Sequence, residues 1–263
     1  MSLRSDSLEG RVALVTGGSR GVGAAIARDL AARGASVGLT YHRNAKAADD
    51  VVSDIRSTGG VALAVKAAVE ERDGWPAVVA AVEDEFGPID LLVSNAGIAS
   101  RGQSVADSDA AEFDRLMNVH AFGPLALIRH LLPTMRRADR SDIVVISSAL
   151  VMSAPPYTAP YIMAKAAVES ACRVLAFEER DNGVRVNIVA PGLVDTDMGN
   201  RLVASGDSSP DAMSAVAARS PFGRVCAPED VAHVVSALVG PAGGYITGQR
   251  VCVDGGGSAP TTH

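Results

Sequence analysis

The chain has 263 residues, a formal net charge of −6 at pH 7 and a hydrophobic content of 48%. This length and this apolar content are enough for one large α/β domain with a sizeable core. The acidic balance and the lack of a Lys/Arg-rich run argue against binding to a polyanion, so we expect no nucleic-acid partner.

The cysteines and histidines are sparse. Cys172, Cys226 and Cys252 lie far apart, which predicts a reducing compartment without disulfides. The histidines show no ligand spacing, so we expect no metal. The first residues lack the apolar core of a signal peptide, and prolines interrupt the longest uncharged run, 143–164. We therefore expect no membrane span and a cytoplasmic location.

Short β-branched runs alternate with Ala-rich runs of helical spacing. In chain order, the first half predicts a strand at 12–16, a helix at 23–33 capped by Gly34, a strand at 36–41, a helix at 45–57, a strand at 61–65, a helix at 75–86 and a strand at 89–94. The second half predicts a helix at 111–135, a strand at 142–147, a helix at 159–180 that ends near Gly183, a strand at 184–190, a helix at 228–239 and a strand at 250–254.

Strands that are apolar throughout, each followed by a helix, are typical of a parallel sheet covered on both faces. The chain has no linker and no shift in composition. We therefore predict an α/β fold, a doubly wound parallel sheet of the Rossmann type with about seven strands, in a single domain over residues 1–263.

A polar stretch at 197–220 interrupts the alternation. Gly199, Ser205 and Gly206 indicate mobility, and we expect the stretch to form a lid over the substrate. Its apolar residues would form a wall of the substrate site, although ordinary helix packing explains the same pattern. These residues are Met198, Leu202, Val203, Met213 and Val216.

The segment "TGGSRGVG" (16–23) directly follows the first predicted strand. Its glycines, 17, 21 and 23, have the spacing G-x-x-x-G-x-G. Such glycines let the backbone approach a pyrophosphate, and the helix N-terminus that follows presents free N–H groups. The pattern predicts a dinucleotide-binding loop, with a plain glycine-rich turn as the alternative.

The end of the second strand, "TYHRN" (40–44), bears on the choice of cofactor. An acidic residue at this place holds the ribose 2′-OH of NAD, whereas a basic residue suits the 2′-phosphate of NADP. No carboxylate is present, and Arg43 there and Arg20 in the glycine loop are basic. We predict NADP(H), with NAD(H) as the alternative if both arginines are ordinary surface residues.

The segment "PPYTAPYIMAK" (155–165) holds two tyrosines and a lysine. A helix places residues four apart on one face, offset by about 40°, so Tyr161 and Lys165 share a face. An ammonium beside a phenol lowers the phenol's pKa from its usual ~10, which makes Tyr161 a usable general acid or base. Tyr157 has no charged neighbour four along, and we expect it to line the site or pack. Ser148, at the end of the fifth strand, is placed to orient a substrate carbonyl.

Together these segments resemble the short-chain dehydrogenase/reductase family over nearly the whole chain. "TGGSRGVG" is similar to the family's cofactor loop, and "SNAG" (94–97) to its N-N-A-G segment with Ser94 in place of the first Asn. "MNVH" (117–120), "ISS" (146–148), "YIMAK" and "PGLVDTDM" (191–198) match in order and spacing.

The resemblance implies a catalytic role for each member of a tetrad. Tyr161 donates a proton to a carbonyl oxygen as hydride arrives from the nicotinamide, and Ser148 holds that oxygen. Lys165 lowers the pKa of Tyr161 and binds the nicotinamide ribose. Asn118 holds a relay water through its backbone carbonyl in a helix kink. The cofactor-binding residues we expect are Gly17, Ser19, Arg20, Gly21, Val22, Gly23, Tyr41, Arg43, Asn95, Ala96, Gly97, Tyr161, Lys165, Pro191, Gly192, Val194 and Thr196.

The resemblance is strongest to 3-oxoacyl-carrier-protein reductases and related tetrameric carbonyl reductases. It implies a ketone or alcohol substrate, with a thioester-linked one left open, and a homotetramer. Two departures matter. Ala68 stands where many members carry an Asp that contacts the adenine, and Asp139 and Asn182 stand where carrier-protein docking arginines are expected. Arg136, Arg137 and Arg140 lie nearby. We therefore favour a free ketone or a polyketide-type substrate.

The sequence leaves two other functions open. One is an NAD-dependent secondary-alcohol dehydrogenase. The other, of a different class, is a sensor or scaffold that binds the nucleotide without turnover. The complete set of Ser148, Tyr161, Lys165 and Asn118 argues against the sensor, since a sensor needs no proton donor.

Overall fold

The computed structural model describes residues 7–206 and 212–257. All seven strands in this part of the chain are parallel and form one sheet in the order β3-β2-β1-β4-β5-β6-β7. The strands are β1 (Val12–Val15), β2 (Ser36–Tyr41), β3 (Val61–Lys66), β4 (Leu91–Ser94), β5 (Ser141–Ile146), β6 (Val184–Pro191) and β7 (Arg250–Val253). The predicted doubly wound α/β fold is confirmed.

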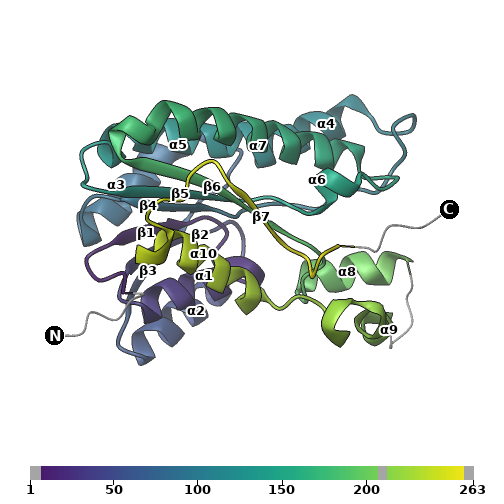
Figure 1. The fold of residues 1–263 in the computed structure, drawn as a ribbon, viewed down its shortest axis with the longest axis horizontal. Helices are drawn as coiled ribbons and strands as arrows, with labels where there is room; N and C mark the ends of the chain where they lie inside the picture. The colour runs from purple at the N-terminus through teal and green to yellow at the C-terminus, as the bar shows by residue number, and fades with distance from the viewer. Residues whose placement is uncertain (1–6, 207–211, 258–263) are drawn as a thin grey trace.

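Helices cover both faces of the sheet, as Figure 1 shows. On one face lie α1 (Gly21–Ala32), α2 (Ala45–Ser57) and α10 (Pro228–Val239). On the other lie α3 (Trp75–Phe86), α4 (Ala110–Met117), α5 (Gly123–Met135) and α7 (Ala159–Glu179). The short α6 (Leu150–Ser153) precedes α7, and short 3-10 turns lie at Arg72–Gly74, Arg180–Asn182, Pro221–Gly223 and Pro241–Gly243.

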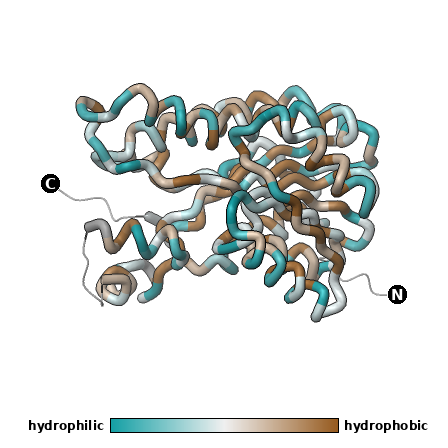
Figure 2. Tube along the Cα trace, turned by 180° about the vertical axis from the view of Figure 1, so that it is seen from behind, coloured by the Kyte–Doolittle hydropathy of each residue, from teal (hydrophilic) through white to brown (hydrophobic). Residues whose placement is uncertain are grey.

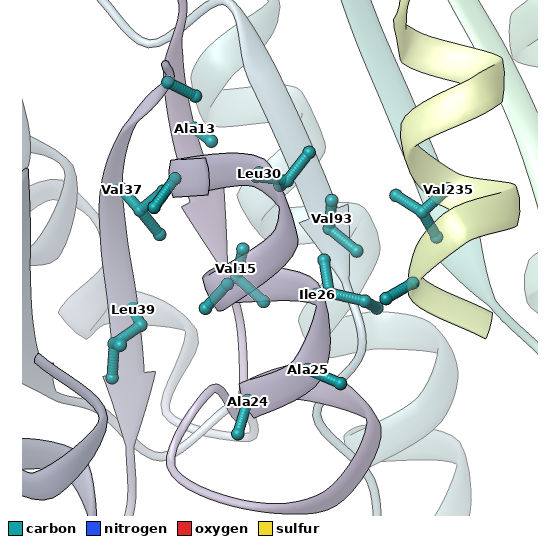
Figure 3. Close-up of a cluster of buried hydrophobic side chains, with 14 of the residues drawn as sticks. Ala13, Val15, Ala24, Ala25, Ile26, Leu30, Val37, Leu39, Val93 and Val235 are labelled. Carbon is teal, nitrogen blue, oxygen red and sulfur yellow. The ribbon is translucent and has the colours of Figure 1, made fainter. Parts of the chain in front are cut away.

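Alternate residues of the central strands β1, β4, β5 and β6 contribute to two hydrophobic cores, one on each face of the sheet. In β1, Ala13 and Val15 pack under α1 and α10 together with Ile26 and Val235, as Figure 3 shows, whereas Leu14 packs on the opposite face. Figure 2 shows hydrophobic residues along the strands, with hydrophilic residues on the outer turns of the helices. This burial on both faces is why the strands are apolar throughout.

The helix predicted from its apolar pattern at 111–135 is not regular, and the kink that the resemblance implies at Asn118 is present. The helix is interrupted by a π-helical turn, η2 (Asn118–Phe122), where the Gly123 N–H donates to the Asn118 carbonyl. Gly123 faces the segment after β3, and a Cβ there would lie 2.2 Å from the Val69 carbonyl oxygen. The extra residue of a π-turn lets the helix pass this close contact, and such turns often mark functional sites.

The stretch at 197–220 contains two helices, α8 (Asp197–Gly206) and α9 (Ala212–Arg219). Both lie beyond the carboxyl ends of the strands, apart from the two helical layers (Figure 1). Met198 and Leu202 of α8 keep 38% and 49% of their surface exposed, so they are not core residues of this chain. Residues 207–211, within the predicted lid, lie outside the described residues.

Candidate active site

The predicted site residues gather at the carboxyl edge of the sheet. The glycine loop follows β1, the 94–97 segment follows β4, Ser148 follows β5 and the 191–196 segment follows β6. In the strand order β1 neighbours both β2 and β4, so consecutive connections leave in opposite directions there. Ligands of open α/β sheets bind at such a switch point.

The glycine loop has the geometry of a phosphate cradle. Gly17 and Gly21 have φ of 66° and 53°, which side chains rarely adopt. A Cβ on Gly23 would lie 2.3 Å from the Gly17 carbonyl oxygen and 2.5 Å from Asn95 Nδ2. Helix α1 begins directly after Arg20, so the backbone N–H groups of its first turn lie beside the loop. The residues present therefore fit a pyrophosphate held at a helix N-terminus.

Two threonines hold this cradle, and the sequence analysis missed both. Thr16 Oγ1 accepts hydrogen bonds from the backbone N–H groups of Asn95 and Ala96 at 2.9 and 3.0 Å. Thr40 Oγ1 accepts one from the Gly17 N–H at 3.1 Å. Asn95 Nδ2 donates to the carbonyls of Thr16 and Gly17 at 3.0 and 3.2 Å. Asn95 thus links the segment after β4 to the glycine loop after β1.

The segment after β6 approaches the same cradle. The Gly192 N–H donates to the Val253 carbonyl at 3.0 Å, directly after Pro191 ends β6. Thr196 Cγ2 would lie 3.2 Å from a Cβ on Gly21, so this threonine borders the glycine loop. Val194 is buried and bridges to Cys226. The 191–196 segment is therefore brought to the expected cofactor site.

Both predicted phosphate-binding arginines are exposed near the glycine loop and β2. Arg20 is the N-cap residue of α1, and Arg43 follows β2 by two residues. Within the described residues neither guanidinium has an ion-pair partner. Tyr41 ends β2 half-buried against the core below the loop. The remaining predicted loop residues are Ser19, which is half-buried, and Val22, which packs against the same core.

Ser148 and Tyr161 are brought together as predicted. Ser148 is 7% exposed, and its side chain lies close enough to the Tyr161 hydroxyl to affect its ionisation. Burial of that hydroxyl raises the pKa of Tyr161, and the interaction with Ser148 opposes the rise. The phenol is therefore neutral near pH 7, which is the protonation state that a proton donor requires.

The predicted direction of the Tyr161 pKa is wrong for the protein chain alone. Lys165 lies on the same helix face, with Nζ 5.9 Å from the Tyr161 ring centroid, but it donates to the Ile146 carbonyl at 2.7 Å. Burial lowers the pKa of Lys165 to about 8, against the opposing effect of Glu169. Desolvation of the phenol outweighs the distant ammonium, which helical spacing could not indicate.

Tyr157 does not pack, because its side chain is 62% exposed and its backbone has φ of 69° in the turn before α7. The other part of the expectation, that Tyr157 lines the substrate site, stays a prediction. Of the two tyrosines, Tyr161 is the one whose hydroxyl lies beside Ser148.

Asn118 begins the π-turn, and its carbonyl accepts the Gly123 N–H. The same turn carries His120, a site residue that the sequence analysis missed. The His120 ring meets the Tyr161 ring edge to face, with centroids 5.1 Å apart, and its Nε2 lies 2.9 Å from the Ile98 carbonyl. Burial, with the nearby charge of Lys165, lowers the pKa of His120 to about 3, so the imidazole is neutral.

Ala68 is 8% exposed beyond β3 and offers no polar side chain. Gly97 lies against His120, since a Cβ there would come 2.7 Å from His120 Cε1. This close contact explains why a glycine is needed at position 97, in addition to its predicted role in cofactor binding.

Among the described residues, no cluster of His, Cys, Asp and Glu could hold a metal ion. No helix in the described ranges is long and apolar enough to cross a membrane.

Comparisons with known proteins match nearly the whole chain. A family model described as enoyl-(acyl carrier protein) reductase matches residues 17–258. The versicolorin reductase of Emericella nidulans is 37% identical over 95% of this chain and 96% of that protein. The cis-4-hydroxycyclohexanecarboxylate dehydrogenase of Sinomonas cyclohexanicum is 37% identical over 95% of this chain and 97% of its own length.

A solved structure has the same fold. A short-chain dehydrogenase from Burkholderia cenocepacia, in complex with NADP, is 35% identical and superimposes with a TM-score of 0.85. The alignment covers 94% of this chain and 98% of that one.

Proposed function

The chain belongs to the short-chain dehydrogenase/reductase family, whose members are NAD(P)-dependent oxidoreductases acting on CH–OH and C=O groups, and from this premise we propose that it is an NADPH-dependent carbonyl reductase. The observation that carries the proposal is the close approach of the buried Ser148 side chain to the Tyr161 hydroxyl, at the sheet edge where the glycine loop lies. The reaction is the reversible conversion of a ketone to a secondary alcohol.

In this mechanism a reduced nicotinamide, when bound, supplies the hydride. The side chains of Ser148 and Tyr161 converge on the place where the substrate carbonyl oxygen would lie. Ser148 orients that oxygen by a hydrogen bond, and the neutral Tyr161 donates its proton there as negative charge develops. A proton donor and an orienting hydroxyl have no use in a protein that only senses a nucleotide.

Lys165 and Asn118 complete the proposed machinery. Lys165 is 5% exposed and is directed towards the end of β5, where it would bind the nicotinamide ribose. Its ammonium favours the phenolate that remains on Tyr161 after proton transfer. Asn118 would hold a relay water through its backbone carbonyl at the π-turn.

We propose NADP(H) as the preferred cofactor, because Arg20 and Arg43 are exposed beside the glycine loop and no carboxylate stands at the end of β2. Replacing Arg43 with Ala is expected to weaken NADPH binding by about tenfold, since a charge-assisted hydrogen bond contributes about 1.5–3 kcal/mol and exposure reduces it. NADH binding should change little. Fluorescence titration of both cofactors, repeated for Arg20→Ala, checks this. Equal losses for NADH and NADPH would favour the NAD-dependent alternative.

We propose a free ring ketone or a small 3-oxoacyl compound as substrate. The names of two relatives, a versicolorin reductase and a hydroxycyclohexanecarboxylate dehydrogenase, support this class. The arginines nearest the expected carrier-protein site are already engaged: Arg136 binds Glu179, and Arg140 binds Asp142. The α8–α9 segment would close over the substrate, with Met198 and Leu202 towards its wall.

The proposed activity is tested by mixing the protein with NADPH and a panel of carbonyl compounds. The panel includes cyclohexanone-type ketones and short 3-oxoacyl thioesters, and cofactor consumption is followed by absorbance. We expect consumption with at least one ring ketone or 3-oxoacyl compound. Cofactor binding without consumption of NADPH or NADH by any carbonyl, and without reduction of NADP⁺ by the matching alcohols, would overturn the proposal.

We further propose a cytoplasmic homotetramer. Helix α7 exposes apolar side chains, among them Val174 at 56% and Phe177 at 69%, and Phe122 of η2 is 45% exposed. A second copy of the chain would cover such a face. Light scattering is expected to give four times the chain mass, and a peak at the monomer mass would remove this proposal. The free cysteines favour a reducing compartment.

A further inference from the structure

We propose that the buried ion pair of Glu169 and Arg250 positions the catalytic residues Ser148 and Lys165, so that the last strand of the sheet takes part in setting the active site. This inference rests on the proposed function, since it assigns positioning residues to the same reaction. Glu169 lies in α7 and Arg250 begins β7, and the two residues are 81 apart in the sequence.

Arg250 bridges Glu169 and the catalytic serine. Its Nε lies 3.0 and 3.1 Å from the two carboxylate oxygens of Glu169. Its Nη2 donates to the backbone carbonyl of Ser148 at 2.8 Å, and its Nη1 contacts Cys252 Sγ at 2.8 Å. Glu169 also accepts a hydrogen bond of 2.5 Å from Ser147 Oγ. One guanidinium therefore joins α7, β7 and the end of β5.

These bonds restrain the backbone of the catalytic serine from several sides. The N–H groups of Ser147 and Ala149 donate to the Val189 and Pro191 carbonyls of β6, both at 2.7 Å. Arg250 binds the carbonyl of Ser148, which lies between them. The Ser148 hydroxyl therefore projects from a backbone held by the carbonyls of β6 and by Arg250 of β7.

The pair is buried, and burial of two charges is costly. The side chains of Glu169 and Arg250 are 1% and 14% exposed. Replacing such a pair by apolar residues is often neutral or stabilising, so a buried pair is weak evidence for a stabilising role. Because Arg250 binds the Ser148 carbonyl and Glu169 lies one helical turn from Lys165, we assign the pair a role in positioning these two residues instead.

The charge of Glu169 also acts on Lys165, one helical turn earlier in α7. The groups that face Lys165 are Tyr161 and Glu169 from α7, the neutral His120 from η2 and, through Glu169, Arg250 from β7. Glu169 is the only carboxylate among these described groups, and Arg173, half-exposed in the next turn, lies 3.8 Å from it. Without the carboxylate, two buried cations would remain near each other.

The two ends of the pair therefore have opposite effects on Lys165. Glu169→Gln leaves the Arg250 cation unopposed and favours the neutral lysine, whereas Arg250→Met leaves Glu169 free to favour the charged lysine. We expect the alkaline limb of the kcat profile for ketone reduction to move by about 1 pH unit, downwards in the first variant and upwards in the second. Both variants should lower kcat by about tenfold through displacement of Ser148, with a smaller change in KM.

The pair of Arg136 and Glu179 provides a matched control. Glu179 lies in the same helix, its side chain is 3% exposed, and it binds Arg136 in the same way. It is 14 residues from Lys165, roughly 21 Å along the helix. Glu179→Gln and Arg136→Met should leave the profile where it is in the wild type. If Glu169→Gln and Arg250→Met behave as these controls do, or shift the profile in the same direction as each other, the inference is overturned.

A measurement that needs no turnover separates this inference from the proposed function. The titration of Lys165 can be followed by NMR of its ¹³Cε, assigned with a Lys165→Met variant. A shift to lower pH in Glu169→Gln, with no shift in Glu179→Gln, supports the positioning role even if no carbonyl is reduced, in which case the proposed function alone fails. An unshifted titration contradicts the inference. If Glu169→Gln does not fold, Arg250→Lys and Arg250→Met provide the same comparison.

Discussion

Replacing Tyr161 with Phe is expected to lower kcat for ketone reduction by about 10³-fold, within the roughly 10²–10⁴-fold range typical of general acid catalysis. The substitution removes only the hydroxyl beside Ser148 and keeps the ring that meets His120. Cofactor affinity and unfolding temperature should therefore change little. Steady-state kinetics with the best ketone of the panel, together with NADPH titration, provide the measurement.

Tyr245→Phe is the matched control, because Tyr245 is fully exposed and loses the same atom. Its kcat should equal that of the wild type. If Tyr161→Phe keeps a kcat within about threefold of the wild type, a loss too small for general acid catalysis, Tyr161 is not the proton donor.

Replacing Asp142 with Asn is expected to reduce the free energy of unfolding by about 3–5 kcal/mol, the usual result of breaking a buried ion pair at one partner. The Asp142 side chain is 3% exposed and is surrounded by three arginines. Arg11 Nη2 and Arg140 Nε lie 3.0 and 3.2 Å from its Oδ2, and Arg185 binds its other oxygen. Removing the carboxylate charge leaves Arg185, whose side chain is 11% exposed, without a carboxylate partner among the described residues, whereas Arg11 keeps its ion pair with Asp90.

For a chain of this size the loss corresponds to a fall in unfolding temperature of roughly 6–20 °C, measured by calorimetry or circular dichroism. Asp54→Asn is the control, since its pair with Arg28 is exposed and contributes about 1 kcal/mol or less. Asp142 lies at the opposite end of the strands from the glycine loop, so kcat of the folded variant should be unchanged. Equal unfolding temperatures for Asp142→Asn and Asp54→Asn would contradict this account of the cluster.

The fold was largely predictable because local patterns and tertiary packing agree. In α1, Gly34 follows the helix with φ of 101°, and in α7 the chain turns at Gly183 with φ of 73°, as the glycine positions indicated. Strands buried on both faces are largely apolar, as in β1 (Val12–Val15), which makes them visible in the sequence.

The family resemblance implied a kink at Asn118, but the apolar pattern did not indicate it, because one extra residue in a helix leaves that pattern almost unchanged. The cause lies in tertiary structure, where Gly123 must pass the backbone at Val69. The pair Gly123-Pro124, inside a predicted helix, was the available signal. No sequence pattern indicated Thr16 or Thr40, because their hydroxyls bond to backbone N–H groups that only folding brings next to them.

Electrostatics were the least predictable feature of the site. Helical spacing places Lys165 beside Tyr161, but it does not indicate how deeply the phenol lies or that Lys165 binds the Ile146 carbonyl. The contact between Arg250 and Ser148 joins residues 102 apart, so no local pattern contains it. Such contacts depend on the assembled sheet.

The most direct test follows a deuterium label from the cofactor to the alcohol product. The protein is given NADPH deuterated on the transferring face of the nicotinamide, with a ketone that it accepts, and the alcohol is analysed by mass spectrometry and NMR. The account predicts that the wild-type protein forms alcohol with one deuterium on the carbinol carbon. Over the same time, Tyr161→Phe is expected to form no detectable labelled alcohol. NADPH oxidation that leaves the carbinol carbon unlabelled, or equal labelling by the two proteins, would contradict it.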